Sequence, residues 1–195
     1  TEIIQANKML EDAKNHLRQE QIPFNEEIEV GAMIETPAAA ICIDHILKEV
    51  SFVSIGTNDL IQYLLAVDRV NESVAHLYQP FHPSVLRSLK NIMKSAENAG
   101  KKVSICGELG GDPMATMLLL GLGKFDDLSM EPHSVPKVKK IIRTIHLEEA
   151  RQIADDVLQM ISPHEIASFI TNTMRVRFPE DFDRNLSFEE KSRPA

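Results

Sequence analysis

The segment FVSIGTNDLIQY, residues 52–63, passes from a strand pattern into a helix pattern. Its first four residues are an apolar run rich in strand-forming side chains, which predicts a strand at 52–55. A small and polar corner follows at 56–59, and apolar residues at helical spacing then predict a helix at 60–67. Strand, corner and helix in this order are typical of one unit of parallel α/β structure.

The same unit recurs along the chain. Further strands are predicted at 28–34, 103–106 and 127–130, and helices at 3–20, 36–49, 83–99, 112–121, 134–144, 147–160 and 164–175. The strands are near-continuous apolar runs, which is typical of strands covered on both faces. The pattern fits a doubly wound sheet or a piece of a (β/α)8 barrel, since a complete barrel needs eight strands and about 250 residues.

Composition excludes several classes of protein. The 195 residues include 21 Lys+Arg and 29 Asp+Glu, a formal net charge of −8, with no Trp and no basic cluster, which argues against nucleic-acid binding. No apolar run approaches the roughly 20 residues that span a bilayer, so no membrane insertion is expected. The two cysteines lack disulfide-framework or metal-site spacing, and a cytoplasmic location fits.

The chain is expected to form one domain at 1–178. The charged, proline-bearing stretch 179–195 is expected to be a flexible tail.

Reactive side chains fall at the ends of the predicted strands, which is where parallel α/β folds place their sites. Glu35 and Asp59 follow the first and second strands, and two carboxylates suit Mg²⁺, which takes oxygen ligands. The alternative is that both acids only stabilise helix N-termini through the helix dipole. Cys106 ends the third strand, either as a small buried hydrophobe or as a thiol facing the site.

Two further residues, Arg69 and Cys42, also have chemically reactive or charged side chains. Arg69 follows the helix after Asp59 and is suited to bidentate contact with a phosphate or carboxylate, although a solvated arginine beside Asp68 is the plainer reading. Cys42 lies on the apolar face of its predicted helix, so we expect it in the core.

The chain resembles the phosphoenolpyruvate (PEP)-utilising enzymes over about residues 8–160. The segment from Phe52 through Arg69 resembles their long signature, GAMIETPA at 31–38 the strand before it, and CGELGGD at 106–112 their catalytic cysteine loop. Residues 77–86, LYQPFHPSVL, are more similar to Enzyme I of the bacterial phosphotransferase system than to the pyruvate, phosphate dikinases. Residues 63–69 lean towards the nitrogen-related form of Enzyme I.

The resemblance implies a (β/α)8 barrel that binds PEP and Mg²⁺. By similarity, Glu35 and Asp59 hold Mg²⁺, Asn58 and Arg69 bind the phosphate, and Cys106 protonates the enolate carbon so that pyruvate forms. The phosphoryl group would pass to a histidine on a separate N-terminal domain and then to the carrier protein HPr. The family also implies a homodimer.

Two family features are missing from this sequence: the Thr-Ser-His phospho-histidine motif and the first half of the barrel. We therefore expect the C-terminal half of a (β/α)8 barrel with extra C-terminal helices, inactive alone in phosphoryl transfer. Its inner sheet face and strand edges are expected to be exposed and apolar, which favours self-association.

Two other interpretations stay open: a fragment of a dikinase or PEP synthase, and a non-catalytic dimerisation or regulatory module. The intact Glu35, Asp59 and Cys106 favour an enzyme over the module.

Overall fold

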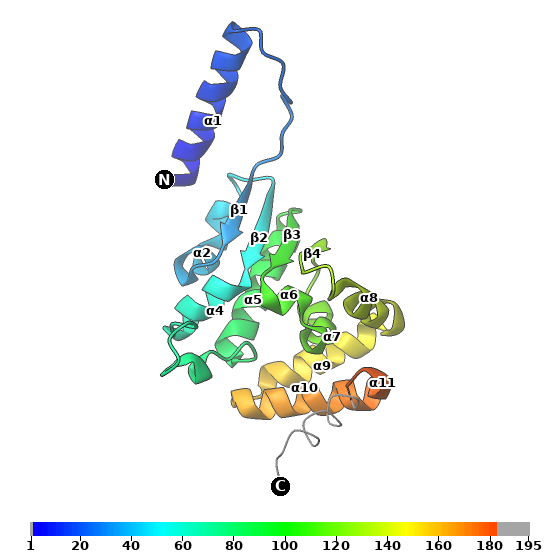
Figure 1. Cartoon of the computed structure of the whole chain (residues 1–195). Helices are drawn as coiled ribbons and strands as arrows, with labels where there is room; N and C mark the ends of the chain where they lie inside the picture. Colours follow the sequence, from blue (N-terminus) through cyan, green and yellow to red (C-terminus); the bar gives the residue numbers. More distant parts are fainter. Residues whose placement is uncertain (1, 183–195) are drawn as a thin grey trace.

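The computed structural model describes residues 2–182 as an α/β structure built on one parallel sheet (Figure 1). The strands are β1 (Gly31–Ile34), β2 (Phe52–Gly56), β3 (Lys102–Cys106) and β4 (Asp127–Leu128). The helices are α1 (Glu2–Gln19), α2 (Pro37–Ile41), α3 (Ile43–Ile46), α4 (Thr57–Leu65), the 3₁₀ turn η1 (Ala75–Leu77), α5 (Pro83–Asn98), α6 (Glu108–Gly111), α7 (Pro113–Leu122), α8 (Val135–Thr144), α9 (Leu147–Gln159), α10 (Pro163–Arg177) and α11 (Pro179–Phe182). None of the helices in this part of the chain is long and apolar enough to cross a membrane.

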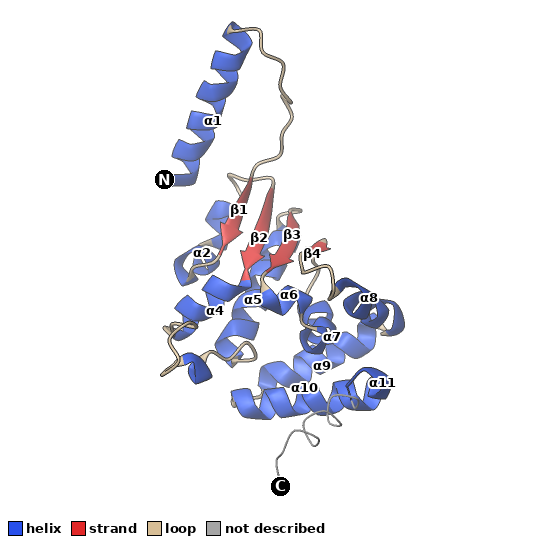
Figure 2. Cartoon of the chain, in the orientation of Figure 1, coloured by secondary structure: helices blue, strands red, loops and turns tan. Residues whose placement is uncertain are grey.

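The strands lie side by side in the order β1-β2-β3-β4, and every neighbouring pair is parallel. A doubly wound sheet reverses its strand order at a switch point, and no such reversal occurs among the described strands. The helices that connect the strands lie on one side of the sheet (Figure 2). The predicted α/β class with parallel strands is confirmed, and the arrangement is consistent with consecutive units of a (β/α)8 barrel.

The two faces of the sheet differ in burial. Ile34, Ile55 and Ile105 are aligned across β1, β2 and β3, and each is 0% exposed beneath the helices. Side chains alternate along a strand, so their neighbours point to the opposite face. That face carries Met33, which is 49% exposed, and the partly exposed Ser54.

The predicted coverage of both faces is therefore wrong for the described residues, because the helices pack on one side only. The expectation of an apolar open face also needs correction. Ser54, Ser104 and Cys106 lie on the open face between its apolar residues, so this face is mixed in polarity.

Several helix starts follow the sequence prediction because local capping sets them. The Thr36 side chain accepts a hydrogen bond from the backbone of Ala39, and Pro37 begins α2. His82, Asp112 and Ser162 cap α5, α7 and α10 in the same manner, each with a proline in the first turn.

Other boundaries differ from the prediction. The strand expected at 28–34 is ordered as β only over β1, and the helix expected at 36–49 is broken at Cys42, whose φ of −96° and ψ of 25° separate α2 from α3. Cys42 is exposed and not a core residue, because it sits at this break. The corner at 56–59 is already the first turn of α4, and residues 108–111 form the short helix α6.

The C-terminal helices α9 and α10 pack on α7 beside the sheet domain (Figure 1). The predicted tail begins with a helix instead, α11, in which the Asp181 carboxylate pairs with Lys140 at 2.7 Å and the Phe182 ring lies 4.6 Å from Lys137 Nζ. The rest of the predicted tail, 183–195, lies outside the described residues. Helix α1 stands apart from the sheet and buries no residue, although Asn7 Nδ2 donates to the Glu49 carbonyl at 2.8 Å.

Candidate functional site

The parallel register brings the ends of β1, β2 and β3 to one rim, and Glu35 and Cys106 both lie beside Gly56 there. Cys106 is the aligned partner of Gly56. A Cβ atom on Gly56 would stand 3.0 Å from Glu35 Oε2 and 3.2 Å from Met33 Sδ, and Met33 Sδ is 3.6 Å from Cys106 Sγ. The carboxylate of Glu35 and the thiol of Cys106 therefore lie in one small region, where the missing side chain of Gly56 lets Glu35 and Met33 pack closely.

The Cys106 thiol lies on the open face of the sheet. Its sulfur is 3.4 Å from the Ile55 carbonyl oxygen, to which it donates, and it accepts a hydrogen bond from the Ser54 hydroxyl at 3.4 Å. The side chain is half-buried. This environment differs from that of a cysteine packed as a small hydrophobe in the core.

Gly107 lets the loop after Cys106 pack tightly against the first turn of α4. Its φ of +95° lies in a region that side chains other than glycine rarely adopt. A Cβ atom there would stand 2.5 Å from Thr57 Oγ1 and 2.9 Å from Asn58 Oδ1. The buried Thr57 hydroxyl donates to the Cys106 carbonyl at 2.8 Å, so β3 and α4 are tied together at this point.

Asn58 is oriented by this same loop. Its Oδ1 accepts a hydrogen bond from the backbone N–H of Glu108 at 3.0 Å. Because the oxygen end of the amide is occupied, the NH₂ end remains to donate to a ligand. Among residues 2–182, no acceptor is bonded to that nitrogen.

Arg69 is turned towards the loop that follows β3, where its side chain pairs with Glu108. The helix before Arg69 ends at Ala66, whose φ of +53° is left-handed, and the Arg69 backbone N–H donates to Gln62 Oε1 at 3.3 Å. Its guanidinium Nη1 donates to the Glu108 carboxylate at 3.4 Å, and its side chain is 34% exposed.

Tyr78, from the loop before α5, lies against this group of charges. Its hydroxyl donates to the Asn58 carbonyl at 3.4 Å. Burial raises the pKa of Tyr78 above its ordinary value, the Glu108 and Asp59 carboxylates raise it further, and Arg69 opposes them. The charges of Asp59, Arg69 and Glu108 therefore all influence the Tyr78 hydroxyl, which stays a hydrogen-bond donor.

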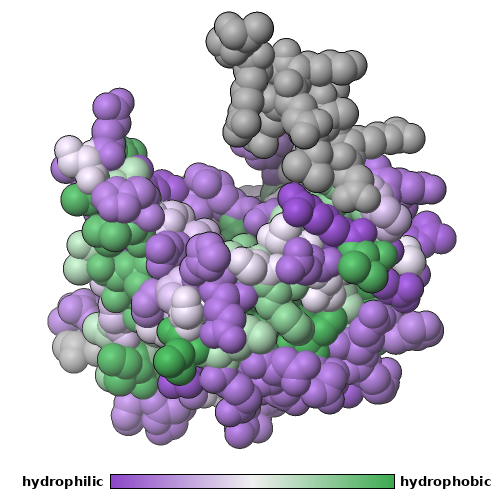
Figure 3. All heavy atoms as spheres, turned by 90° about the horizontal axis from the view of Figure 1, so that it is seen from below, coloured by the Kyte–Doolittle hydropathy of each residue, from purple (hydrophilic) through white to green (hydrophobic). Residues whose placement is uncertain are grey.

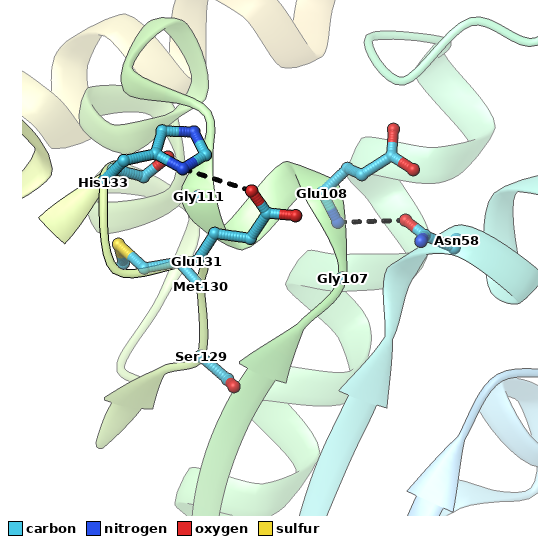
Figure 4. Close-up of a pocket in the computed structure, with 9 residues that line it drawn as sticks. Asn58, Gly107, Glu108, Gly111, Ser129, Met130, Glu131 and His133 are labelled. Atoms are coloured by element: carbon cyan, nitrogen blue, oxygen red, sulfur yellow. Dashed lines mark hydrogen bonds and ion pairs between the residues drawn. The ribbon is translucent and has the colours of Figure 1, made fainter.

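A cavity of about 540 Å³ opens beside Asn58 at the carboxyl ends of β3 and β4 (Figure 4). Its lining is mostly polar and comprises Asn58, Gly107, Glu108, Gly111, Ser129, Met130, Glu131, His133 and Ser134. Glu131 pairs with His133 Nδ1 at 3.2 Å, and the Glu108 side chain points away from that pair. The cavity offers room for a small polar ligand next to the strand-end residues.

Of the two carboxylates predicted to bind a cation, Glu35 directly follows β1 and Asp59 lies in the first turn of α4, directly after β2. Within residues 2–182, no group of three or more His, Cys, Asp or Glu side chains is placed to hold a metal. Mg²⁺ commonly binds proteins through one or two carboxylates, with water and substrate oxygens completing its shell. Glu35 and Asp59 carry side chains of the type this donor set requires, and the Glu35 carboxylate packs closely over Gly56.

Sequence reasoning missed Glu108 and Tyr78 as members of the site. Glu108 follows Cys106 at the end of β3, so its position was a signal that the sequence already carried. Tyr78 lies 20 residues beyond Asn58 in a loop, and no spacing rule connects the two.

Comparison with known proteins identifies relatives of one kind. Residues 1–147 match the model of a family described as "PEP-utilising enzyme, PEP-binding domain". The chain is 47% identical over 169 residues to the phosphoenolpyruvate-protein phosphotransferase of Haemophilus influenzae and 43% identical over 175 residues to that of Priestia megaterium. These alignments cover 87% and 90% of this chain but 29% and 30% of the relatives.

A relative of the same name from Buchnera aphidicola is 46% identical over 80% of the chain and 27% of its own length. The resemblance inferred from the sequence signatures is thus confirmed at the level of the family. The chain spans a little under a third of the length of these relatives, and it belongs to the PEP-utilising enzymes, through their PEP-binding domain.

Proposed function

We propose that this chain is the PEP-binding part of a phosphoenolpyruvate-protein phosphotransferase and that it acts in a longer protein. The observation that carries the proposal is the meeting of Glu35 and Cys106 beside Gly56, with Asn58 and Arg69 tied to the adjoining loop. The relatives support it, because each is named for this activity and extends well beyond the matched region.

In the proposed reaction, the P–O bond of PEP breaks and the phosphoryl group moves to a histidine on another domain, then to an HPr-type carrier. Glu35 and Asp59 would hold Mg²⁺, which supplies neutralisation of the charge that shifts among the phosphoryl oxygens. Arg69 and the free amide end of Asn58 would bind the phosphate through charged and neutral hydrogen bonds. These residues would orient the substrate across the strand ends.

Cys106 would complete the reaction as a general acid. After phosphoryl transfer, the enolate carbon takes the thiol proton and pyruvate forms, and the thiolate regains a proton from solvent. The thiol group carries one proton on its sulfur, which is the proton that the enolate carbon would take. The position of the sulfur on the open face supports this role, since a buried thiol could not reach the substrate.

The test is phosphoryl transfer from labelled PEP to a purified HPr-type carrier, with the full-length protein that carries this chain. We expect Mg²⁺-dependent transfer that is lost in Glu35→Gln and Asp59→Asn. Conversion of pyruvate, ATP and phosphate into PEP by the same protein would instead support the dikinase alternative. Absence of both activities would leave a non-catalytic module and overturn the proposal.

We also propose that the protein is a cytoplasmic homodimer. Apolar groups interrupt the hydrophilic surface when the molecule is viewed from the end towards which the strands run (Figure 3). The most exposed large hydrophobic residues include Ile161 and Val176, each 84% exposed. Light scattering of the 195-residue chain should give a dimer or larger species, and a monomer at all concentrations would contradict the dimer.

A further inference from the structure

Glu108 has no part in the reaction proposed above, yet it contacts both side chains assigned to the substrate phosphate. Its backbone N–H donates to Asn58 Oδ1 at 3.0 Å, and its carboxylate accepts from Arg69 Nη1 at 3.4 Å. The two contacts use different parts of the residue. The backbone contact orients Asn58 whatever the side chain at 108, whereas the ion pair depends on the carboxylate.

The two members of the Arg69–Glu108 ion pair differ in their exposure to solvent. The Arg69 side chain is 34% exposed, while that of Glu108 is 81% exposed. A solvated carboxylate can turn away from its partner at little cost, because exposed ion pairs contribute little free energy. Arg69 is the less exposed member, and its main chain is held by the bond between its backbone N–H and Gln62 Oε1.

A phosphate and the Glu108 carboxylate would compete for the same guanidinium. Both are oxyanions, and arginine binds either one through the same N–H groups. Glu108 also borders the cavity next to Asn58, so the competition would take place beside the other phosphate-binding side chain. Before substrate binds, however, the pair keeps Arg69 turned towards the loop that follows β3.

We propose that Glu108 is a positioning residue that holds Arg69 in place and is displaced from it by the phosphate of the substrate. This inference rests on the proposed function, because it takes Arg69 and Asn58 as the phosphate-binding side chains. Loss of a merely structural residue would weaken phosphate binding. Removing the charge of Glu108 should instead strengthen phosphate binding, because it frees the Arg69 guanidinium.

The test is calorimetric titration of the 195-residue chain with inorganic phosphate, comparing the unmodified chain with Glu108→Gln. The glutamine keeps the backbone contact to Asn58 and removes the charge, so we expect binding to tighten about two- to fivefold. Glu131→Gln is the matched control. Glu131 borders the same cavity and carries the same charge, but it pairs with His133, so we expect no comparable change.

Two further measurements separate competition at Arg69 from other effects. In an Arg69→Gln background, the gain from Glu108→Gln should disappear, since the shared guanidinium is gone. In the full-length protein, Glu108→Gln should lower the KM for PEP severalfold and leave kcat within about twofold, since only binding of the phosphate changes.

The outcomes distinguish the two proposals. Phosphate binding by Glu108→Gln that is equal to or weaker than that of the unmodified chain would show that Glu108 does not compete with phosphate for Arg69, which overturns this inference and leaves the proposed function standing. Equal tightening in Glu131→Gln would also overturn it, because loss of any nearby charge would then suffice. If neither inorganic phosphate nor PEP with Mg²⁺ binds to any variant, the proposed function fails, and this inference fails with it.

Discussion

The helix-covered face and the open face of the sheet are built from the same strands but carry different kinds of side chain. Ile55 on the covered face is 0% exposed, whereas its neighbour Ser54, on the open face, bonds the Cys106 thiol. Burial of large apolar side chains dominates folding stability, while reactive groups need access to a ligand. Because side chains alternate between the two faces, adjacent residues of one strand serve different roles: one stabilises the fold and the next lines the candidate site.

The largest effect is expected from Cys106→Ala on the open face. If this thiol is the general acid, turnover in the full-length protein should fall by about 10²- to 10⁴-fold, while Mg²⁺-dependent PEP binding changes little. Cys42→Ala is the matched control, since Cys42 is exposed at the break between α2 and α3. Steady-state kinetics and titration with PEP check both variants, and undiminished turnover in Cys106→Ala would remove it from the mechanism.

On the covered face, Ile55→Ala should lower the free energy of unfolding by about 2–5 kcal/mol, since it leaves a cavity under the helices. Ser54→Ala, one residue away, removes only a hydroxyl that bonds Cys106 and should cost less than about 1 kcal/mol. Denaturant unfolding measures both. Similar losses of unfolding free energy in the two variants would show that the covered face does not contribute more to stability than the open face.

A smaller loss of stability is expected at Gly107, in the loop that joins β3 to the candidate site. Gly107→Ala should cost about 1–3 kcal/mol for its backbone angles alone, φ +95° and ψ −178°, and more for the contact with Thr57 Oγ1. Gly100→Ala provides the comparison, because its φ is +65° but a Cβ there would meet nothing within 4 Å. Thermal unfolding should therefore show a larger loss at Gly107, and equal losses would mean that the tight packing adds nothing.

The smallest effect concerns the Asp112 cap of α7. Burial raises the pKa of Asp112, while the Met114 backbone N–H and Lys137 oppose that shift. A raised folded-state pKa means that the charged carboxylate is disfavoured, so its stability contribution is full at low pH and is lost as pH rises through the folded pKa.

Asp112→Asn keeps an oxygen that can accept from Met114 and removes the charge. It should therefore raise the melting temperature at pH 7 by an amount worth less than about 1 kcal/mol. This gain should vanish as the pH falls below the pKa of Asp112. Thermal melts across pH check the sign, and a variant less stable at pH 7 would contradict it.

The predictable features of this protein are those fixed by short-range chemistry. Thr36 and Pro37 mark the start of α2 because a cap acts within one turn, and the strand ends locate Glu35 and Cys106 because parallel strands share a direction. The Arg69–Glu108 pair joins residues 39 apart, and the break at Cys42 depends on local backbone angles, so neither could be derived from a periodic pattern. The open sheet face was misjudged because near-continuous apolar strands do not reveal which side helices will cover.

The most direct measurement of the central proposal uses the two cysteines in one experiment. A thiol reagent should modify both the exposed Cys42 and the half-buried Cys106 in the full-length protein, and mass spectrometry should report each rate separately. We predict that PEP with Mg²⁺ slows modification of Cys106 severalfold, does not affect Cys42, and loses this protection in Glu35→Gln. Protection that is absent at Cys106, or the same at both cysteines, would contradict a common site at the ends of the strands.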